Sequence, residues 1–218
     1  MAELILTDPA ERDDIGAFVA RAVRLEPQTV VRLRNREPAG HDTGRQLLDL
    51  WAVTPFDVLV TRSVPGRVEP ADLSVAGSDL LAGLAVSRSA RIDPGHAQDL
   101  LWRSALPPTQ GWQPVDQLPA SVLSELTDRG VALARENPGP HGTPPASLLD
   151  QTVLTVSGSG LEVKVPLRCL FALSGMGFLG GGEGGENVRV TATDAWLRID
   201  ARYGAIVRRR HALLPLLV

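Results

Sequence analysis

Apolar residues recur at two different spacings along this chain of 218 residues, and the spacings predict both helices and strands. Residues 9–24 carry apolar side chains at helical intervals, and Asp8 and Pro9 are favoured residues at a helix start. Residues 29–34 alternate between apolar and polar side chains, which is typical of a half-buried strand. Further helices are predicted at 79–87, 94–102, 119–136 and 167–173, and further strands at 48–53, 57–61, 73–75, 152–156, 161–165, 188–192, 196–201 and 205–209.

These elements predict an α+β protein with antiparallel or mixed sheets and several helices. The order strand, helix and three strands occurs in residues 4–61 and again in 161–209. Each time a tryptophan stands early in the second strand after the helix, at Trp51 and Trp196. The recurrence indicates either an internal repeat or, as we favour, two similar α+β units of independent origin. Residues 73–136 are then a degenerate third copy or an insertion.

Proline and glycine mark the predicted boundary between two regions. Residues 137–145 read NPGPHGTPP, which is the strongest linker signal in the chain. This segment predicts an N-terminal α+β region at 1–136 and a strand-rich C-terminal α+β region at 146–218. Residues 107–119 are also rich in proline and glycine, and they predict a connector inside the N-terminal region.

Composition narrows the class of protein. Hydrophobic residues make up 44% and charged residues 22% of the chain, which is typical of a soluble globular protein. Of the 22 basic residues only Lys164 is a lysine, and this arginine bias is typical of a high-GC bacterial genome. The chain has no run of about 18 apolar residues, and its first residues are acidic, unlike a signal peptide. We therefore expect a cytoplasmic protein without membrane contact.

The sequence offers no credible catalytic set. Residues 175–180 match the dinucleotide-binding pattern G-x-G-x-x-G, but four more glycines and a strand pattern follow instead of a helix, so we interpret the segment as a loop. The histidines lack metal-ligand spacing, and the only cysteine, Cys169, lies in an apolar run and is expected in the core. We predict no catalytic residue, cofactor or metal, and no enzymatic activity. An enzyme remains the alternative if loops bring His41 near carboxylates in a pocket.

Arginines concentrate in two places, although the net charge of −3 argues against a protein that coats nucleic acid. Residues 188–218 contain six arginines and two aspartates, a local charge of +4. An alternating strand near residue 32 places three further arginines on one face. The candidate contacts for phosphates or other anions are Arg32, Arg34, Arg36, Arg208, Arg209 and Arg210. A solvated strand end, or an ion-paired contact between the two termini, is the alternative.

The chain ends in an apolar segment, residues 211–218, that is too short to span a bilayer. Such a segment packs into the protein's own core, into a partner subunit or into a groove of another protein. The candidate interface residues are Leu213, Leu214, Leu216 and Leu217.

The C-terminal third resembles one repeat of a DNA sliding clamp. The sequence LEVKVPL at 161–167 runs into a predicted helix, and VRVTATD at 188–194 precedes WLRID at 196–200. The resemblance implies a helix between such strands and, in the clamp family, rings that surround DNA with basic helices. It covers about a quarter of the chain, between residues 161 and 209.

Two functional hypotheses follow. In the first, the protein is not an enzyme and acts through contacts with a protein partner or with a second copy of itself, because it has surplus strands and an apolar tail. In the second, it is a DNA-associated, clamp-like module that uses an arginine-rich face.

Overall fold

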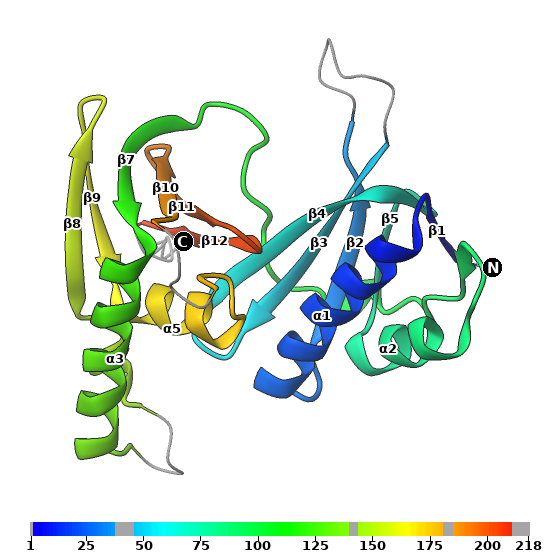
Figure 1. Ribbon diagram of the computed structural model, residues 1–218, viewed down its shortest axis with the longest axis horizontal. Coiled ribbons are helices and arrows are strands. Elements are labelled where there is room, and N and C mark those ends of the chain that lie inside the picture. The colour runs from blue at the N-terminus through cyan, green and yellow to red at the C-terminus, as the bar shows by residue number, and fades with distance from the viewer. Residues whose placement is uncertain (1, 38–45, 140–143, 181–184, 211–218) are drawn as a thin grey trace, which may run out of the picture. The chain divides into compact units, whose positions relative to one another are not determined.

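The computed structural model describes residues 2–37, 46–139, 144–180 and 185–210, and the chain forms two compact units (Figure 1). Unit 1 comprises Met1–Pro55 with Leu59–Ala105, and unit 2 comprises Phe56–Val58 with Leu106–Val218. Both units combine helices with antiparallel strands, which confirms the predicted α+β class. In the described part of the chain, no helix is long and apolar enough to cross a membrane.

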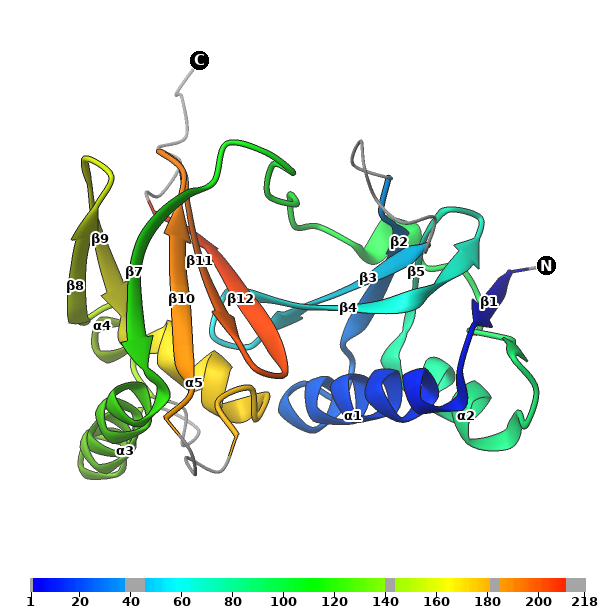
Figure 2. The ribbon, with the colours of Figure 1, turned by 45° about the horizontal axis from the view of Figure 1, so that its top comes forward.

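Unit 1 is a sheet with two helices on one side of it, as Figure 2 shows for α1 and α2. Its elements are β1 (Glu3–Leu6), α1 (Pro9–Leu25), β2 (Val30–Asn35), β3 (Leu47–Thr54), β4 (Val58–Glu69), β5 (Asp72–Ala76), α2 (Gly77–Val86), β6 (Arg91–Ile92) and the 3₁₀ turn η1 (Asp99–Leu101). The strands follow the order β5-β2-β3-β4, and β1 pairs with both β4 and β6. The sheet therefore combines the consecutive strands β2, β3 and β4 with pairings between strands that are distant in sequence, β5 with β2 and β1 with β4 and β6.

Local sequence explains where α1 begins and how β2 is oriented. The Asp8 side chain accepts a hydrogen bond from the Ala10 N–H at 2.8 Å, and Glu11 accepts one from the Asp8 N–H at 2.9 Å, so a capping box satisfies the first N–H groups of the helix. Along β2, Val31 and Leu33 are fully buried in the core. The side chains between them point to the opposite face because successive strand residues alternate.

Unit 2 contains the rest of the secondary structure. Its elements are β7 (Gln113–Pro119), α3 (Ala120–Glu136), α4 (Ala146–Leu149), β8 (Thr152–Gly158), β9 (Leu161–Pro166), α5 (Leu167–Gly175), β10 (Asn187–Ala192), β11 (Trp196–Ala201) and β12 (Gly204–Arg209). The strands β12-β11-β10-β7 form an antiparallel sheet, and β8 and β9 form the predicted hairpin. Helices α3 and α5 pack closely at Gly130, where a Cβ atom would lie 2.3 Å from Cδ1 of Leu167.

The predicted order of strand, helix and three strands is present in both places. It corresponds to β1-α1-β2-β3-β4 and to β9-α5-β10-β11-β12. The middle of the chain, predicted as a degenerate copy or an insertion, contains two further strand–helix pairs, β5-α2 and β7-α3. A strand therefore leads into a helix four times in the described residues.

The helix predicted over 94–102 is wrong. Only the 3₁₀ turn η1 forms there, because Gly95 adopts a left-handed backbone (φ +98°) and its N–H donates to the side chain of Asp93 at 2.9 Å. Asp93 therefore stabilises a turn and does not cap a helix. The two compact units divide near residue 105, whereas the predicted linker at 137–145 follows α3 within the range of unit 2.

Candidate nucleic-acid interface

The first group of predicted contact residues lies on one face of unit 1. Arg32 and Arg34 alternate with the buried residues Val31 and Leu33, so they point away from the core. Arg32 stands opposite Trp51 of β3 in the strand register. We call this surface the arginine face of unit 1 and define it by Arg32, Arg34, Arg36, Asp49 and Asp72.

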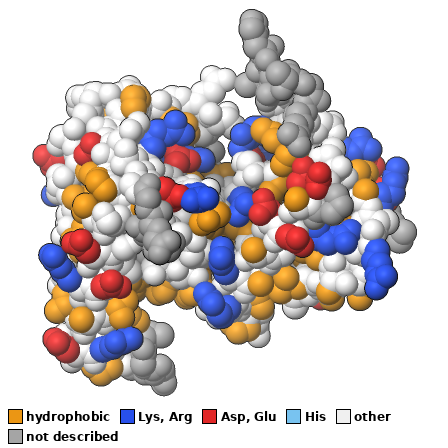
Figure 3. All heavy atoms as spheres, in the orientation of Figure 1, with side chains coloured by type: hydrophobic (Ala, Val, Ile, Leu, Met, Phe, Trp, Pro, Cys, Tyr) orange, Lys and Arg blue, Asp and Glu red, His pale blue; other side chains and the backbone are white. Residues whose placement is uncertain are grey.

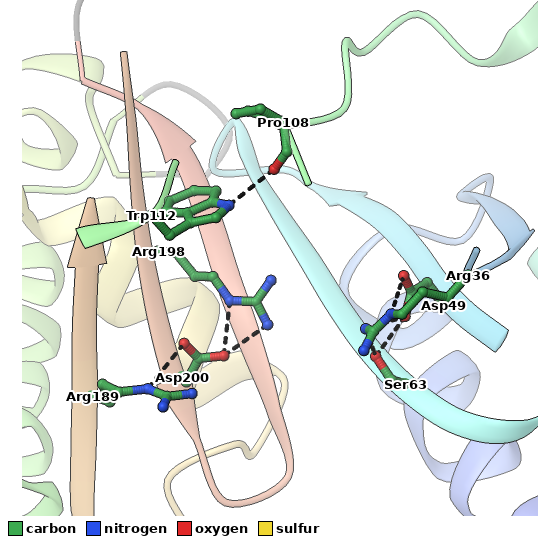
Figure 4. A network of polar contacts seen from close by, with 8 residues as sticks. All are labelled: Arg36, Asp49, Ser63, Pro108, Trp112, Arg189, Arg198 and Asp200. Atoms are coloured by element: carbon green, nitrogen blue, oxygen red, sulfur yellow. Dashed lines mark hydrogen bonds and ion pairs between the residues drawn. The ribbon is translucent and has the colours of Figure 1, made fainter. Parts of the chain in front are cut away.

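Aspartates offset most of the charge on this face. The Arg32 guanidinium donates from Nε and Nη2 to the two carboxylate oxygens of Asp72, both at 2.7 Å, and this hydrogen bonding raises the pKa of Arg32 above its ordinary value. Arg34 lies 3.8 Å from the same carboxylate. Arg36 donates to Asp49 and to Ser63, both at 2.6 Å (Figure 4). Three arginines and two aspartates leave a formal charge of +1.

A second arginine face lies on unit 2, and of its arginines only Arg209 was predicted as a contact from the sequence. Arg189 of β10 and Arg198 of β11 both reach Asp200, at 3.9 and 2.7 Å (Figure 4). On the same face, the Arg209 guanidinium lies 4.5 Å from the ring centroid of Trp196, a cation–π contact. We define the arginine face of unit 2 by Arg189, Arg198, Asp200, Trp196 and Arg209, with a formal charge of +2.

The structure does not bring the triplet Arg208–Arg210 together. Arg208 pairs in register with the buried Leu197, so it points to the core side, and its Nη2 lies 3.6 Å from Asp150. Arg210 donates to the backbone carbonyls of Thr193 and Glu162. Only Arg209 of the three belongs to the arginine face of unit 2.

The signal for the missed residues is present in the sequence. The alternation Val188-Arg189-Val190 buries the valines, at 2% and 0% exposure, and therefore turns Arg189 outward. The same period applied to the triplet separates Arg208 from Arg209. The candidate interface residues Leu213, Leu214, Leu216 and Leu217, and His41 with them, lie outside the described residues.

The helices do not have the charge that the clamp resemblance implies. In the described residues, the helices together contain six arginines and seven aspartates or glutamates, a formal charge of −1. One of these arginines, Arg168 of α5, is only 8% exposed and donates to Asp150 at 2.9 Å. Figure 3 shows acidic and basic side chains interspersed on the displayed surface. Positive charge therefore gathers on strands and not on helices.

Metal chemistry has no visible site in the described ranges. Within them, no group of three histidine, cysteine, aspartate or glutamate side chains is placed to hold a metal ion. The one cysteine, Cys169, is fully buried, and burial raises the pKa of its thiol to about 12.

Solved structures identify the class of fold. The chain aligns over 99% of its length with the DNA polymerase III subunit β sliding clamp of Bartonella birtlesii (TM-score 0.54, 14% identity, 67% of that chain). It aligns over 100% with a DNA polymerase III β subunit from Eubacterium rectale (TM-score 0.60, 12% identity, 66% of that chain). The sliding clamp of Bacillus subtilis gives a TM-score of 0.56 at 13% identity, over 99% of this chain and 66% of that one.

The chain therefore has a sliding-clamp-like fold, and it spans about two thirds of the length of these clamps. Residues 1–104 match the family model described as domain of unknown function DUF8010, and residues 107–213 match the one described as domain of unknown function DUF8185. The division between the two matches coincides with the division between the two units. No curated protein matches the sequence.

Proposed function

We propose that this protein is a clamp-fold module that associates with duplex DNA through the arginine faces of its sheets. The observation that carries the proposal is the fold match to DNA polymerase sliding clamps over 99–100% of the chain. The charge distribution supports it: the strands carry the clustered arginines, while the helices carry a formal charge of −1. The contact with DNA then differs from that of a ring lined with basic helices.

The arginine face of unit 2 is the stronger of the two surfaces. Of its three arginines, Arg189 and Arg198 share the carboxylate of Asp200, Arg209 contacts the Trp196 ring instead, and the Arg189 side chain is 62% exposed. On unit 1 both Arg32 and Arg36 make short ion pairs, so a phosphate has to compete with a carboxylate for each of them, whereas on unit 2 only Arg198 is held in this way. We therefore expect two or three phosphate contacts, mainly from unit 2.

Binding to duplex DNA is expected to weaken about 10- to 40-fold between 50 and 200 mM salt, because each neutralised phosphate adds about 0.9 to the slope of log K against log salt. Fluorescence anisotropy with a labelled duplex measures this slope. The variant Arg189→Ala/Arg198→Ala/Arg209→Ala is expected to bind at least about tenfold more weakly and to lose most of the slope.

Two control variants test which surface binds. Arg21→Ala/Arg129→Ala/Arg135→Ala removes three charges from α1 and α3 and is expected to retain binding. Arg208→Ala removes a charge from the core side of β12 and is also expected to retain it. If the α1/α3 variant lost binding while Arg189→Ala/Arg198→Ala/Arg209→Ala retained it, the DNA contact would have to be assigned to the helices and not to the strands. Absence of salt-sensitive binding in the unmodified protein would remove DNA association altogether.

Self-association is the second candidate function. It is favoured by the helices, which are nearly neutral and expose the apolar residues Val86, Val122 and Leu133 at 81%, 37% and 44%. Such surfaces suit protein contact better than contact with phosphates. The four candidate leucines of the tail, Leu213, Leu214, Leu216 and Leu217, would add apolar area to the same association.

Deletion of residues 211–218 tests the second candidate. If the tail joins two copies, the truncated chain is expected to elute as a smaller species in size-exclusion chromatography with light scattering. Its melting temperature is then expected to lose its dependence on protein concentration, since association stabilises the folded state by mass action. An unchanged assembly state together with unchanged melting would exclude a role for the tail in association.

A further inference from the structure

A short segment of unit 1 runs along the outer edge of strand β5. We call residues 97–102 the edge segment. Ala97 forms a β-bridge with Val75, and the Gln98 N–H donates to the carbonyl oxygen of Ser74 at 2.7 Å. The Ser74 N–H in turn donates to Oδ1 of Asp99, also at 2.7 Å. A carboxylate thus takes the place that a neighbouring strand's carbonyl would have, and it holds the edge segment against the sheet.

A pocket of about 250 Å³ opens beside the edge segment. It is lined by Arg32, Asp72, Ser74, Asp99 and Trp102. The Arg32 guanidinium lies 5.7 Å from the ring centroid of Trp102 and is held by both oxygens of Asp72. The pocket therefore combines an aromatic wall with two carboxylates and a single arginine.

Asp99 is the carboxylate whose charge is not offset by an ion pair. Asp72 forms ion pairs with Arg32 and Arg34, whereas Asp99 acts on Arg32 only through space, as one of the charges that raise the pKa of that guanidinium, and forms no ion pair within 4 Å among the described residues. Its side chain accepts one hydrogen bond there, the one from the Ser74 N–H to Oδ1. A carboxylate beside an indole ring is a favourable environment for an organic cation.

The residues next to the pocket are unusually exposed apolar side chains. Leu100 is 90% exposed and Leu101 is 57% exposed, both on the turn η1 that leads into Trp102. Adjacent exposed leucines next to a charged pocket are typical of an interaction surface. Because the backbone hydrogen bonds of the edge segment to β5 fix this turn, little ordering is needed when a partner binds.

We propose that this pocket and the two leucines bind a protein segment that carries an arginine or lysine side chain beside bulky apolar residues. The cation pairs with Asp99 in the pocket that Trp102 also lines, and the apolar neighbours pack on Leu100 and Leu101. Arg32 and Asp72 belong both to this pocket and to the arginine face of unit 1, whereas Asp99 and Trp102 belong to the pocket alone. Because the DNA contact is expected mainly from unit 2, changes at Asp99 and Trp102 test the peptide assignment separately from DNA association.

The probe is the peptide acetyl-Leu-Leu-Arg-amide, titrated into the ¹⁵N-labelled full chain. The indole N–H of Trp102, which donates to the carbonyl of Ser104, and the amide of Ser74 are expected to shift in two-dimensional NMR spectra. Trp102→Phe identifies the indole signal. Acetyl-Leu-Leu-Glu-amide is expected to leave both signals in place, and arginine amide alone to bind more weakly than the tripeptide.

Asp99→Asn is the decisive variant, because the asparagine oxygen still accepts the Ser74 N–H while the charge is gone. We expect it to weaken binding of the arginine peptide about tenfold, as for loss of a charged hydrogen-bond partner. Asp13→Asn, which removes the same charge from an exposed position on α1, is expected to bind like the unmodified chain. Equal shifts with the arginine and glutamate peptides, or unchanged affinity in Asp99→Asn, would overturn the proposal.

Discussion

Cys169 is expected to react with a thiol reagent at least about 10³-fold more slowly than an exposed cysteine at pH 8. Its side chain is fully buried, and burial raises the pKa of the thiol from 9.0 to about 12, against the opposing effect of Arg208 and Arg168. Because the thiolate is the reactive form, a rise of about three pKa units lowers the reactive fraction about 10³-fold. Absorbance of the released thiolate of Ellman's reagent measures the rate.

The control is Leu100→Cys in a Cys169→Ala background, since residue 100 is 90% exposed. The cysteine at position 100 is expected to react at the rate of a free thiol. Cys169 is expected to reach that labelling rate only when the protein is unfolded in denaturant. Rapid labelling of Cys169 in the native chain would contradict its placement in the core.

The buried thiol also has a consequence for the pH dependence of stability. Above pH 9 the unfolded thiol ionises and the native one does not, so stability should fall by about 1 kcal/mol per pH unit toward pH 12, and Cys169→Ala should lack this component.

The elements that the sequence predicts correctly are those set by neighbouring residues. Helix α1 follows from the Asp8 cap and from the helical spacing of Ile15, Phe18 and Val19, which are all nearly fully buried. The β8–β9 hairpin follows from a turn in which Ser159 and Gly160 both adopt positive φ. The helix predicted at 94–102 fails because Asp93 can form either of two local structures. It can cap a helix, or it can accept the Gly95 N–H and stabilise a turn, as it does in the structure.

The candidate site is harder to predict from the sequence because its arginines form ion pairs with aspartates that are distant in sequence. Arg32 is paired with Asp72, which is 40 residues away, and Arg36 with Asp49 across a strand pair. Before the sheet order is known, neither partner can be identified, so the arginines read as unpaired. The separation of Arg208 from Arg209 is different in kind, because strand alternation alone predicts it.

The clamp resemblance covered residues 161–209, and the fold match extends it to the whole chain. The basic helices that the clamp resemblance implies are not found, since the described α-helices contain one more acidic residue than arginines. Backbone topology depends on apolar spacing and turns, whereas surface charge is free to vary without changing either. Fold and charge therefore have to be argued separately for this chain.

The substitution of glycine by alanine is expected to have opposite effects in the two helices of unit 1. A Cβ atom on Gly83 of α2 would lie 2.1 Å from the carbonyl oxygen of Asp93, and the obstacle is backbone that cannot turn aside. At Gly16 of α1 a Cβ atom would meet nothing within 4 Å. Gly83→Ala should therefore lower the free energy of unfolding by about 1–3 kcal/mol through overpacking. Gly16→Ala should raise it by about 0.5–1 kcal/mol, because alanine is the better helix former.

Urea unfolding of both variants, followed by circular dichroism, measures the two changes against the unmodified chain. The contrast isolates packing from helix propensity, because propensity alone predicts stabilisation at both positions. If Gly83→Ala were as stable as Gly16→Ala, then α2 would not lie against the Asp93 segment, and the register of β6 beside β1 would have to change with it. The edge segment with its pocket continues directly from that part of the chain, so its geometry depends on the same packing.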